Sequence, residues 1–145
     1  MRSAQRDRQN AGSMAQDRTP FELIGGADRI HALIERFYEV MFVTEPALTR
    51  LHQTAPDGRV DPAMQHRFEL FVIGWLGGPQ DYTAQHGHPR LRMRHARVQV
   101  DLAMRDAWLR CMDQAMNEVQ ITGPVRNYLD ARFVEVADFM RNTPD

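Results

Sequence analysis

The sequence predicts an all-α protein. Apolar residues recur at helical spacing along several segments, and the longest series is Ile30, Leu33, Ile34, Phe37 and Met41. Helix-capping residues and Gly or Pro pairs stand at the ends of these segments. The alternation of apolar and polar residues that marks a half-buried strand is absent. We therefore expect four substantial helices, in an arrangement less regular than an up-down bundle.

The first half of the chain predicts two helices and a turn-rich segment. Thr19-Pro20-Phe21-Glu22 has the capping-box pattern, with Pro at the first helical position, and Gly25-Gly26 ends this short helix. The long helix described above follows. Residues 45–59 are predicted to be rich in turns, because Pro56-Asp57-Gly58 is a strong turn signal.

The second half predicts three helices and an irregular connection. Asp61-Pro62 begins a helix that Gly77-Gly78-Pro79 ends, and Asp101 caps another. Residues 80–100 have room for one or two short helices, near Tyr82 and over 91–95. Thr122-Gly123-Pro124 precedes the last helix. The three apolar faces are Met64, Phe68, Phe71, Val72 and Trp75, then Met104, Trp108, Cys111, Met112, Ala115 and Val119, and finally Val125, Leu129, Phe133, Val136 and Met140.

Length and composition indicate one globular domain with a polar extension. The chain has 145 residues, 43% of them hydrophobic, and a formal net charge of −1. We expect residues 1–18 to form a flexible extension and 19–145 to form the domain. The charge gives no net attraction to nucleic acid or anionic membranes, and no apolar run is long enough to span a bilayer. The single Cys111 and the polar first residues favour a cytoplasmic protein.

Three blocks of sequence carry a resemblance to a known family. They are Trp75-Leu76-Gly77-Gly78-Pro79, the run from Gly87 to His95, and Arg105 to Met112. In this order they resemble the group II truncated hemoglobins, over roughly residues 19–142. The resemblance implies a two-over-two helical sandwich, heme b as cofactor and His95 as the axial ligand of the iron. Imidazole is a common axial ligand of heme iron.

The resemblance also implies roles for residues around the heme. Tyr38, from the Phe37-Tyr38 pair, Trp108 and His52 would stabilise a bound ligand by donating hydrogen bonds, and His52 falls at a position beside the distal site that varies within the group. Met64 and Phe68 would form the apolar part of the distal side. The residues expected to pack against the heme are Phe37, Phe71, Val98 and Met112, and those expected near its propionates are Arg67, Tyr82 and Arg94. Ala96-Arg97-Val98 departs from the family's usual Pro-Phe after the axial histidine.

These roles predict a protein that binds O2, CO or NO tightly and releases O2 slowly. Such behaviour suits redox chemistry, sensing, or detoxification of NO or peroxide better than bulk transport. A peroxidase-like or NO dioxygenase-like activity would need a separate reductase, because the chain has no flavin or nicotinamide motif. The iron could be pentacoordinate or reversibly hexacoordinate, and the protein a monomer or a homodimer.

Two other interpretations start from the same residues. His86, His88 and His95 could bind zinc in a heme-free helical regulator, with Asp81 or His66 as a fourth ligand. A nucleic-acid-binding module could use Arg90, Arg92, Arg94 and Arg97, although the chain's charge and motifs do not favour it.

Overall fold

The computed structural model describes residues 18–89 and 100–141, and these ranges contain seven helices and no strand. Their bounds are α2 (Pro20–Ile24), α3 (Ala27–Thr44), α4 (Pro46–Arg50), α5 (Pro62–Trp75), α6 (Asp81–His86), α8 (Leu102–Glu118) and α9 (Gly123–Met140). The prediction of an all-α fold is confirmed. The short helix expected near Tyr82 is α6, whereas the one expected over 91–95 lies outside the described residues.

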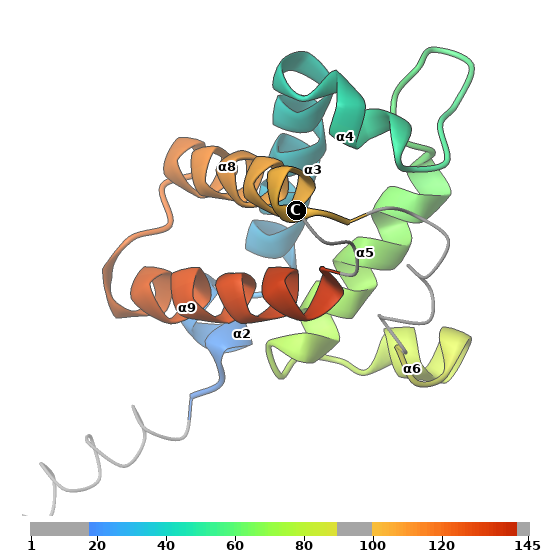
Figure 1. Cartoon of the computed structure of the whole chain (residues 1–145). Helices are drawn as coiled ribbons and strands as arrows, with labels where there is room; N and C mark the ends of the chain where they lie inside the picture. Colours follow the sequence, from blue (N-terminus) through green and yellow to red (C-terminus); the bar gives the residue numbers. More distant parts are fainter. Residues whose placement is uncertain (1–17, 90–99, 142–145) are drawn as a thin grey trace, which may run out of the picture.

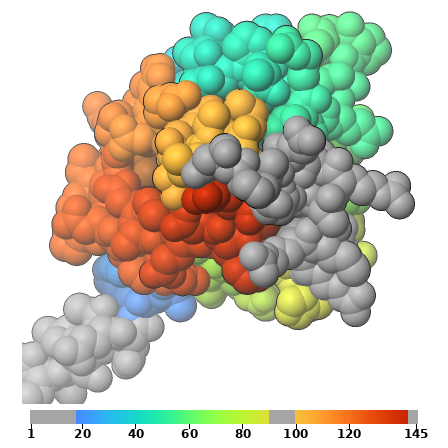
Figure 2. All heavy atoms as spheres, viewed as in Figure 1, coloured from blue at the N-terminus to red at the C-terminus, as the bar shows by residue number. Residues whose placement is uncertain are grey.

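The four long helices form two layers, each a pair. In Figure 1, α8 and α9 run side by side across the front, and α3 and α5 form the layer behind them. The most extensive helix contact joins α3 to α8, and α3 also packs along α5. Figure 2 shows α8 and α9 together covering much of one face of the molecule. This arrangement is the two-over-two sandwich that the sequence predicts.

Side-chain caps fix where three helices begin, as the sequence predicts. The hydroxyl of Thr19 accepts a hydrogen bond from the backbone N–H of Glu22 at 3.2 Å. The carboxylate of Asp61 accepts from the N–H of Ala63 at 2.9 Å. Asp101 accepts from the N–H of Met104 at 2.9 Å. Each cap satisfies a backbone donor that has no partner within its own helix.

The Gly pairs let α2 lie directly on the end of α5. The backbone N–H of Phe21 donates to the carbonyl of Leu76 at 2.9 Å. A Cβ at Gly78 would lie 2.6 Å from the Phe21 ring, so only glycine allows this approach. Gly25 turns the chain out of α2 with a φ of 111°, which glycine adopts without strain. The two pairs therefore act together, because α2 begins beside one and ends at the other.

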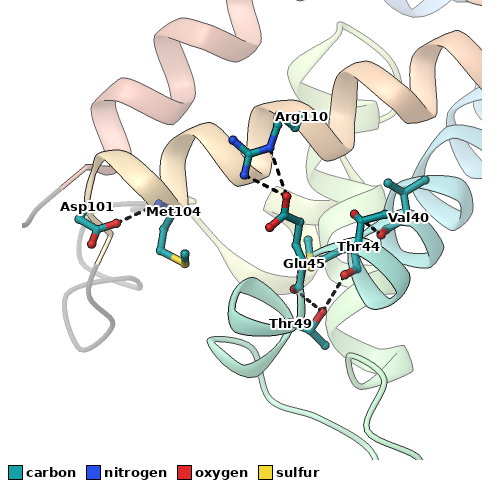
Figure 3. Close-up of polar contacts among 8 residues, drawn as sticks. Val40, Thr44, Glu45, Thr49, Asp101, Met104 and Arg110 are labelled. Carbon is teal, nitrogen blue, oxygen red and sulfur yellow. Dashed lines mark hydrogen bonds and ion pairs between the residues drawn. The ribbon is translucent and has the colours of Figure 1, made fainter.

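The corner between α3 and α4 is more regular than the sequence predicts. Residues 45–59 were expected to be turn-rich, but Pro46–Arg50 forms α4, with Pro at its first turn. The buried Thr49 hydroxyl donates to the carbonyls of Met41 and Glu45. The guanidinium of Arg110 on α8 donates to the Glu45 carboxylate at 2.9 Å (Figure 3). These contacts stabilise one helical turn too short to show a hydrophobic period.

None of the helices in the described part of the chain combines the length and the apolar character needed to cross a membrane.

We predict that Gly78→Ala destabilises the fold by about 1–3 kcal/mol, because the new methyl group would overlap the Phe21 ring and displace α2. Urea unfolding measures the change. Gly74→Ala, within α5, is the matched control, since its Cβ would meet its nearest neighbour, the Gln80 side chain, at 3.4 Å. There alanine should be neutral or stabilising by up to about 1 kcal/mol. Equal effects of the two substitutions would contradict the close approach at Gly78.

We predict a pH-dependent contribution from the ion pair that joins α3 to α5. The Nδ1 atom of His31 lies 2.5 Å from the Glu69 carboxylate, and this contact raises the pKa of His31 above its usual value. A raised folded-state pKa means that the stabilisation is full below about pH 6.5 and is lost as the pH rises through the folded value. Glu69→Gln should therefore cost about 0.2–1 kcal/mol near pH 6. At pH 9 the urea midpoints of the two proteins should coincide, and a constant difference would contradict the assignment.

Candidate functional site

A cavity of about 410 Å³ lies where α3, α5, α8 and α9 meet. Residues of α4, of the turn after it and of α6 complete its wall. Most of the lining is apolar or aromatic, which suits a flat hydrophobic ligand. A few polar groups reach the cavity, and their chemistry decides what can bind there.

Tyr38 on α3 brings a hydroxyl to the cavity. Its side chain is buried, and its ring contacts the ring of Phe37 edge-on, with centroids 5.1 Å apart. No other residue in the described ranges forms a hydrogen bond with this hydroxyl. Burial raises the pKa of Tyr38 far above its usual value. The hydroxyl therefore stays protonated at neutral pH and is available to donate into the cavity.

Trp108 on α8 faces the same cavity. Its ring packs edge-on against Phe37 at 5.4 Å, Phe68 at 6.2 Å and Phe133 at 5.7 Å, measured between centroids. Three aromatic neighbours from α3, α5 and α9 thus fix the orientation of the indole. The indole N–H can only donate a hydrogen bond. Two donors, on opposite layers, therefore reach one cavity.

His52, in the turn after α4, also lines the cavity beside Tyr38, with ring centroids 6.2 Å apart. Its Nδ1 atom lies 2.9 Å from the carbonyl of Leu48. A carbonyl only accepts, so Nδ1 carries a proton, and the neutral ring has only an acceptor at Nε2. His52 can therefore donate into the cavity only as the imidazolium, a constraint that the sequence does not show.

The residues expected to pack against heme divide into two groups. Met64, Phe68 and Phe71, all on α5, line the cavity. Phe37 and Met112 do not line it, and their side chains are at most 1% exposed. The structure places these two in the core, because their positions face the close packing of α3 on α8.

Two arginines and a second tyrosine line the cavity: Arg67, Arg105 and Tyr82. Tyr82 is buried and its ring packs edge-on against Phe71. Arg105 is held by the carboxylates of Asp106 and Asp138, which neutralise it. Arg67 has no ion pair with any residue in the described ranges, so its charge remains available to an anionic group of a ligand.

Four further residues, not expected from the sequence, also line the cavity: Arg105, Leu48, Leu51 and Val136. Arg105 lies three residues before Trp108, a spacing that puts both on one face of α8 and could have indicated it. Leu48 and Leu51 lie in and just after α4, in the segment expected to be turns. No pattern in the sequence indicates that these two residues form part of the cavity wall.

Three predicted site residues lie outside the described residues: His95, Arg94 and Val98. Of the zinc alternative, His86 and His88 are described and His95 is not. Within 18–89 and 100–141, no three His, Cys, Asp or Glu side chains form a group that could hold a metal.

Comparisons with known proteins identify the family to which this fold belongs. The family model for bacterial-like globins matches residues 19–142. The chain belongs to the bacterial-like globin family, among the group II truncated hemoglobins. It is 35% identical to group 2 truncated hemoglobin YjbI of Bacillus subtilis (strain 168), over 85% of this chain and 88% of the relative.

Solved structures agree with this assignment. The group II truncated hemoglobin of Bacillus anthracis is 35% identical, with a TM-score of 0.79, and the match covers 88% of this chain and 94% of that one. The truncated oxygen-avid haemoglobin of Bacillus subtilis has a TM-score of 0.75 at 35% identity, covering 86% and 100% of the two chains. This globin therefore binds heme b, and through it small diatomic ligands such as O2.

The cavity has the chemistry that heme b requires. Aromatic and aliphatic side chains of α5, α8 and α9 provide apolar contacts for the porphyrin faces. The Arg67 guanidinium is a cation with no ion pair to a described residue, as the anionic propionates would need, and Tyr38 and Trp108 bring potential hydrogen-bond donors to the same wall.

We predict that Tyr38→Phe changes the unfolding free energy of the ferric globin by less than about 0.5 kcal/mol, because the hydroxyl has no partner among the described residues to lose. Urea unfolding measures it. The control is Thr49→Val, which removes a buried hydroxyl with two carbonyl partners and should cost about 1 kcal/mol. A loss at Tyr38 as large as that at Thr49 would show that the phenol is structural.

Proposed function

We propose that this globin binds O2 tightly, releases it slowly, and serves redox chemistry or detoxification of NO or peroxide rather than bulk oxygen transport. The observation that carries the proposal is that Tyr38 and Trp108, whose hydroxyl and indole N–H have no hydrogen-bond partner among residues 18–89 and 100–141, line one apolar cavity. Heme iron supplies the reversible binding of the diatomic ligand, and the remaining features belong to the chain.

His95 is the proposed axial ligand, on the strength of the family motif around it. Described residues before and after it in the chain support this choice. Val100, five residues later, lines the cavity, and so does Tyr82 on the preceding helix α6. The connection that carries His95 therefore joins two segments that each contribute a residue to the cavity wall. Arg94 and Val98, on the same connection, remain proposed as a propionate partner and a heme contact.

The two donors act on a ligand that carries partial negative charge. A donor that is already oriented costs little to use, and the three rings around Trp108 and the edge contact of Tyr38 provide that orientation. Met64 and Phe68 exclude water from the same side without competing for the ligand. Escape of the ligand then requires two hydrogen bonds to break with no water to replace them.

His52 lies beside Tyr38 at the same cavity, and its Nδ1 atom contacts the Leu48 carbonyl at 2.9 Å. Tyr38 itself is held as the neutral phenol by burial, which disfavours its binding to the iron as an anion. We therefore propose that Tyr38 leaves the sixth position of the iron open to external ligands.

The propionates of heme are proposed to contact Arg67 and Tyr82. Arg67 provides a cation without a described ion pair, and Tyr82 places a phenol ring at the cavity wall. Arg105 is less suited, because two carboxylates already surround it.

Turnover requires an electron source, and we propose a separate reductase in the cytoplasm. The relative from Bacillus subtilis described as oxygen-avid supports the slow-release part of the proposal. A globin that holds O2 tightly transports it poorly but keeps it in place for reaction with NO or for reduction.

We predict that Trp108→Phe and Tyr38→Phe each speed O2 dissociation by about tenfold, the effect of losing one hydrogen bond of ~1.4 kcal/mol to a partly charged acceptor. Stopped-flow mixing of the oxygenated ferrous globin with excess CO measures the rate. Trp75→Phe is the matched control, because Trp75 does not line the cavity. An off-rate that is unchanged in both pocket variants would contradict the proposed distal site.

A further inference from the structure

Trp75 is the other tryptophan of the chain besides Trp108, and it does not line the heme cavity. It is the last residue of α5, only partly buried at the edge of the core. The guanidinium carbon of Arg132 on α9 sits 5.1 Å from the centre of its ring. The pocket chemistry described above gives this side chain no role.

Aromatic contacts connect Trp75 to the cavity by two routes. Through α9, the ring of Phe133 lies 5.3 Å from Trp75 and 5.7 Å from Trp108, between centroids. Within α5, Trp75 stacks on Phe71 at 6.2 Å with an interplanar angle of 16°. Phe71 lines the cavity. A single ring therefore separates Trp75 from the cavity indole on one route and from the cavity itself on the other.

The series of ring contacts from Trp108 through Phe133 to Trp75 has an indole at each end. Indole loses an electron far more readily than a phenyl ring does, so the series has an oxidisable group at the cavity and another at the surface. Phenylalanine or leucine could cover part of the same partly buried area without a polar group. Packing alone explains the two intervening Phe residues, whereas the indole at the outer end adds a cation–π contact with Arg132 and a readily oxidised ring.

We propose that Trp75 is a surface oxidation site, at which the holoprotein takes electrons from bulky phenolic donors that cannot enter the cavity. This inference rests on the proposed redox function. The oxidant is a hydroperoxide that reaches the cavity, and Trp108 and Phe71 are the cavity side chains nearest to Trp75 along the two routes. The site gives large donors access to the heme chemistry without opening the cavity to water.

The electrons and protons balance in this scheme. Hydrogen peroxide takes up two electrons and two protons and becomes two molecules of water. Each electron leaves Trp75 toward the cavity, and the indole N–H proton passes to solvent, which leaves a neutral indolyl radical. A phenol then gives one hydrogen atom to restore Trp75 and departs as a phenoxyl radical. Two phenols are consumed for each peroxide.

Arg132 assists the proton loss. A cation above an indole ring is attracted to the neutral ring but repels the positive charge that oxidation creates. Oxidised Trp75 is therefore driven to release its N–H proton and form the neutral radical. Arg132 donates to the Glu135 carboxylate at 2.5 Å, which holds the guanidinium near the ring from within α9 and offsets part of its charge.

The test compares the ferric holoprotein with two variants, Trp75→Phe and Tyr128→Phe. Tyr128 is the matched control, because it is an oxidisable residue 43% exposed on α9 that makes none of the ring contacts described above. Each protein is mixed with hydrogen peroxide and a nitroso spin trap, digested, and mapped by mass spectrometry for the trapped adduct. Oxidation of a bulky phenol and of iodide, a small donor that can enter the cavity, is measured in parallel. CO binding to the ferrous form confirms that each variant retains its heme site.

We expect the trap to label Trp75 in the parent protein and in Tyr128→Phe. We also expect Trp75→Phe to lose the label and to oxidise the bulky phenol several-fold more slowly, while its oxidation of iodide is unchanged. An adduct on Tyr128 alone, or an undiminished rate with the bulky phenol in Trp75→Phe, would overturn the proposal. So would a holoprotein that binds CO normally and forms no protein radical with peroxide, and this result would leave the proposed ligand binding intact.

Discussion

The packing of α3 on α8 is the constraint on which the rest of this globin depends. Phe37 from one helix meets Trp108 from the other edge-on, and both layers of the sandwich are positioned by this crossing. The crossing closes the core around Phe37 and Met112, and the cavity opens beside it. Because Tyr38 follows Phe37 directly, the helix that seals the core also aims a phenol into the cavity.

The cavity concentrates groups that the fold itself does not use. Elsewhere in the described structure, arginines are largely paired with carboxylates, and the buried Thr49 hydroxyl has two acceptors. At the cavity, the Tyr38 hydroxyl, the Trp108 N–H and the Arg67 guanidinium have no hydrogen bond or ion pair with a described residue, and we propose that heme and its diatomic ligand engage them. Binding of heme to the folded state would then stabilise the protein.

The sequence predicts those features that depend on local chemistry. The caps at Thr19, Asp61 and Asp101 and the long helical periods all appear in the structure, because each is set by residues within a turn or two. Helix α4 has a single turn and no period, so its contribution to the cavity wall could not be predicted. Whether Phe37 packs against heme or in the core depends on how closely α3 and α8 approach each other. Which ring nitrogen of His52 carries the proton depends on the carbonyl of Leu48, in the same unpredicted helix α4.

This chain is a heme globin, and we propose that His95 holds its iron. The visible absorption spectrum of the protein reconstituted with hemin, recorded ferric, reduced and under CO, tests this ligation when the parent chain is compared with His95→Ala. We predict stoichiometric heme uptake and a Soret band that shifts sharply with CO in the parent, and loss of that spectrum in the variant. An unchanged spectrum in His95→Ala, or a parent protein that takes up no heme, would contradict it.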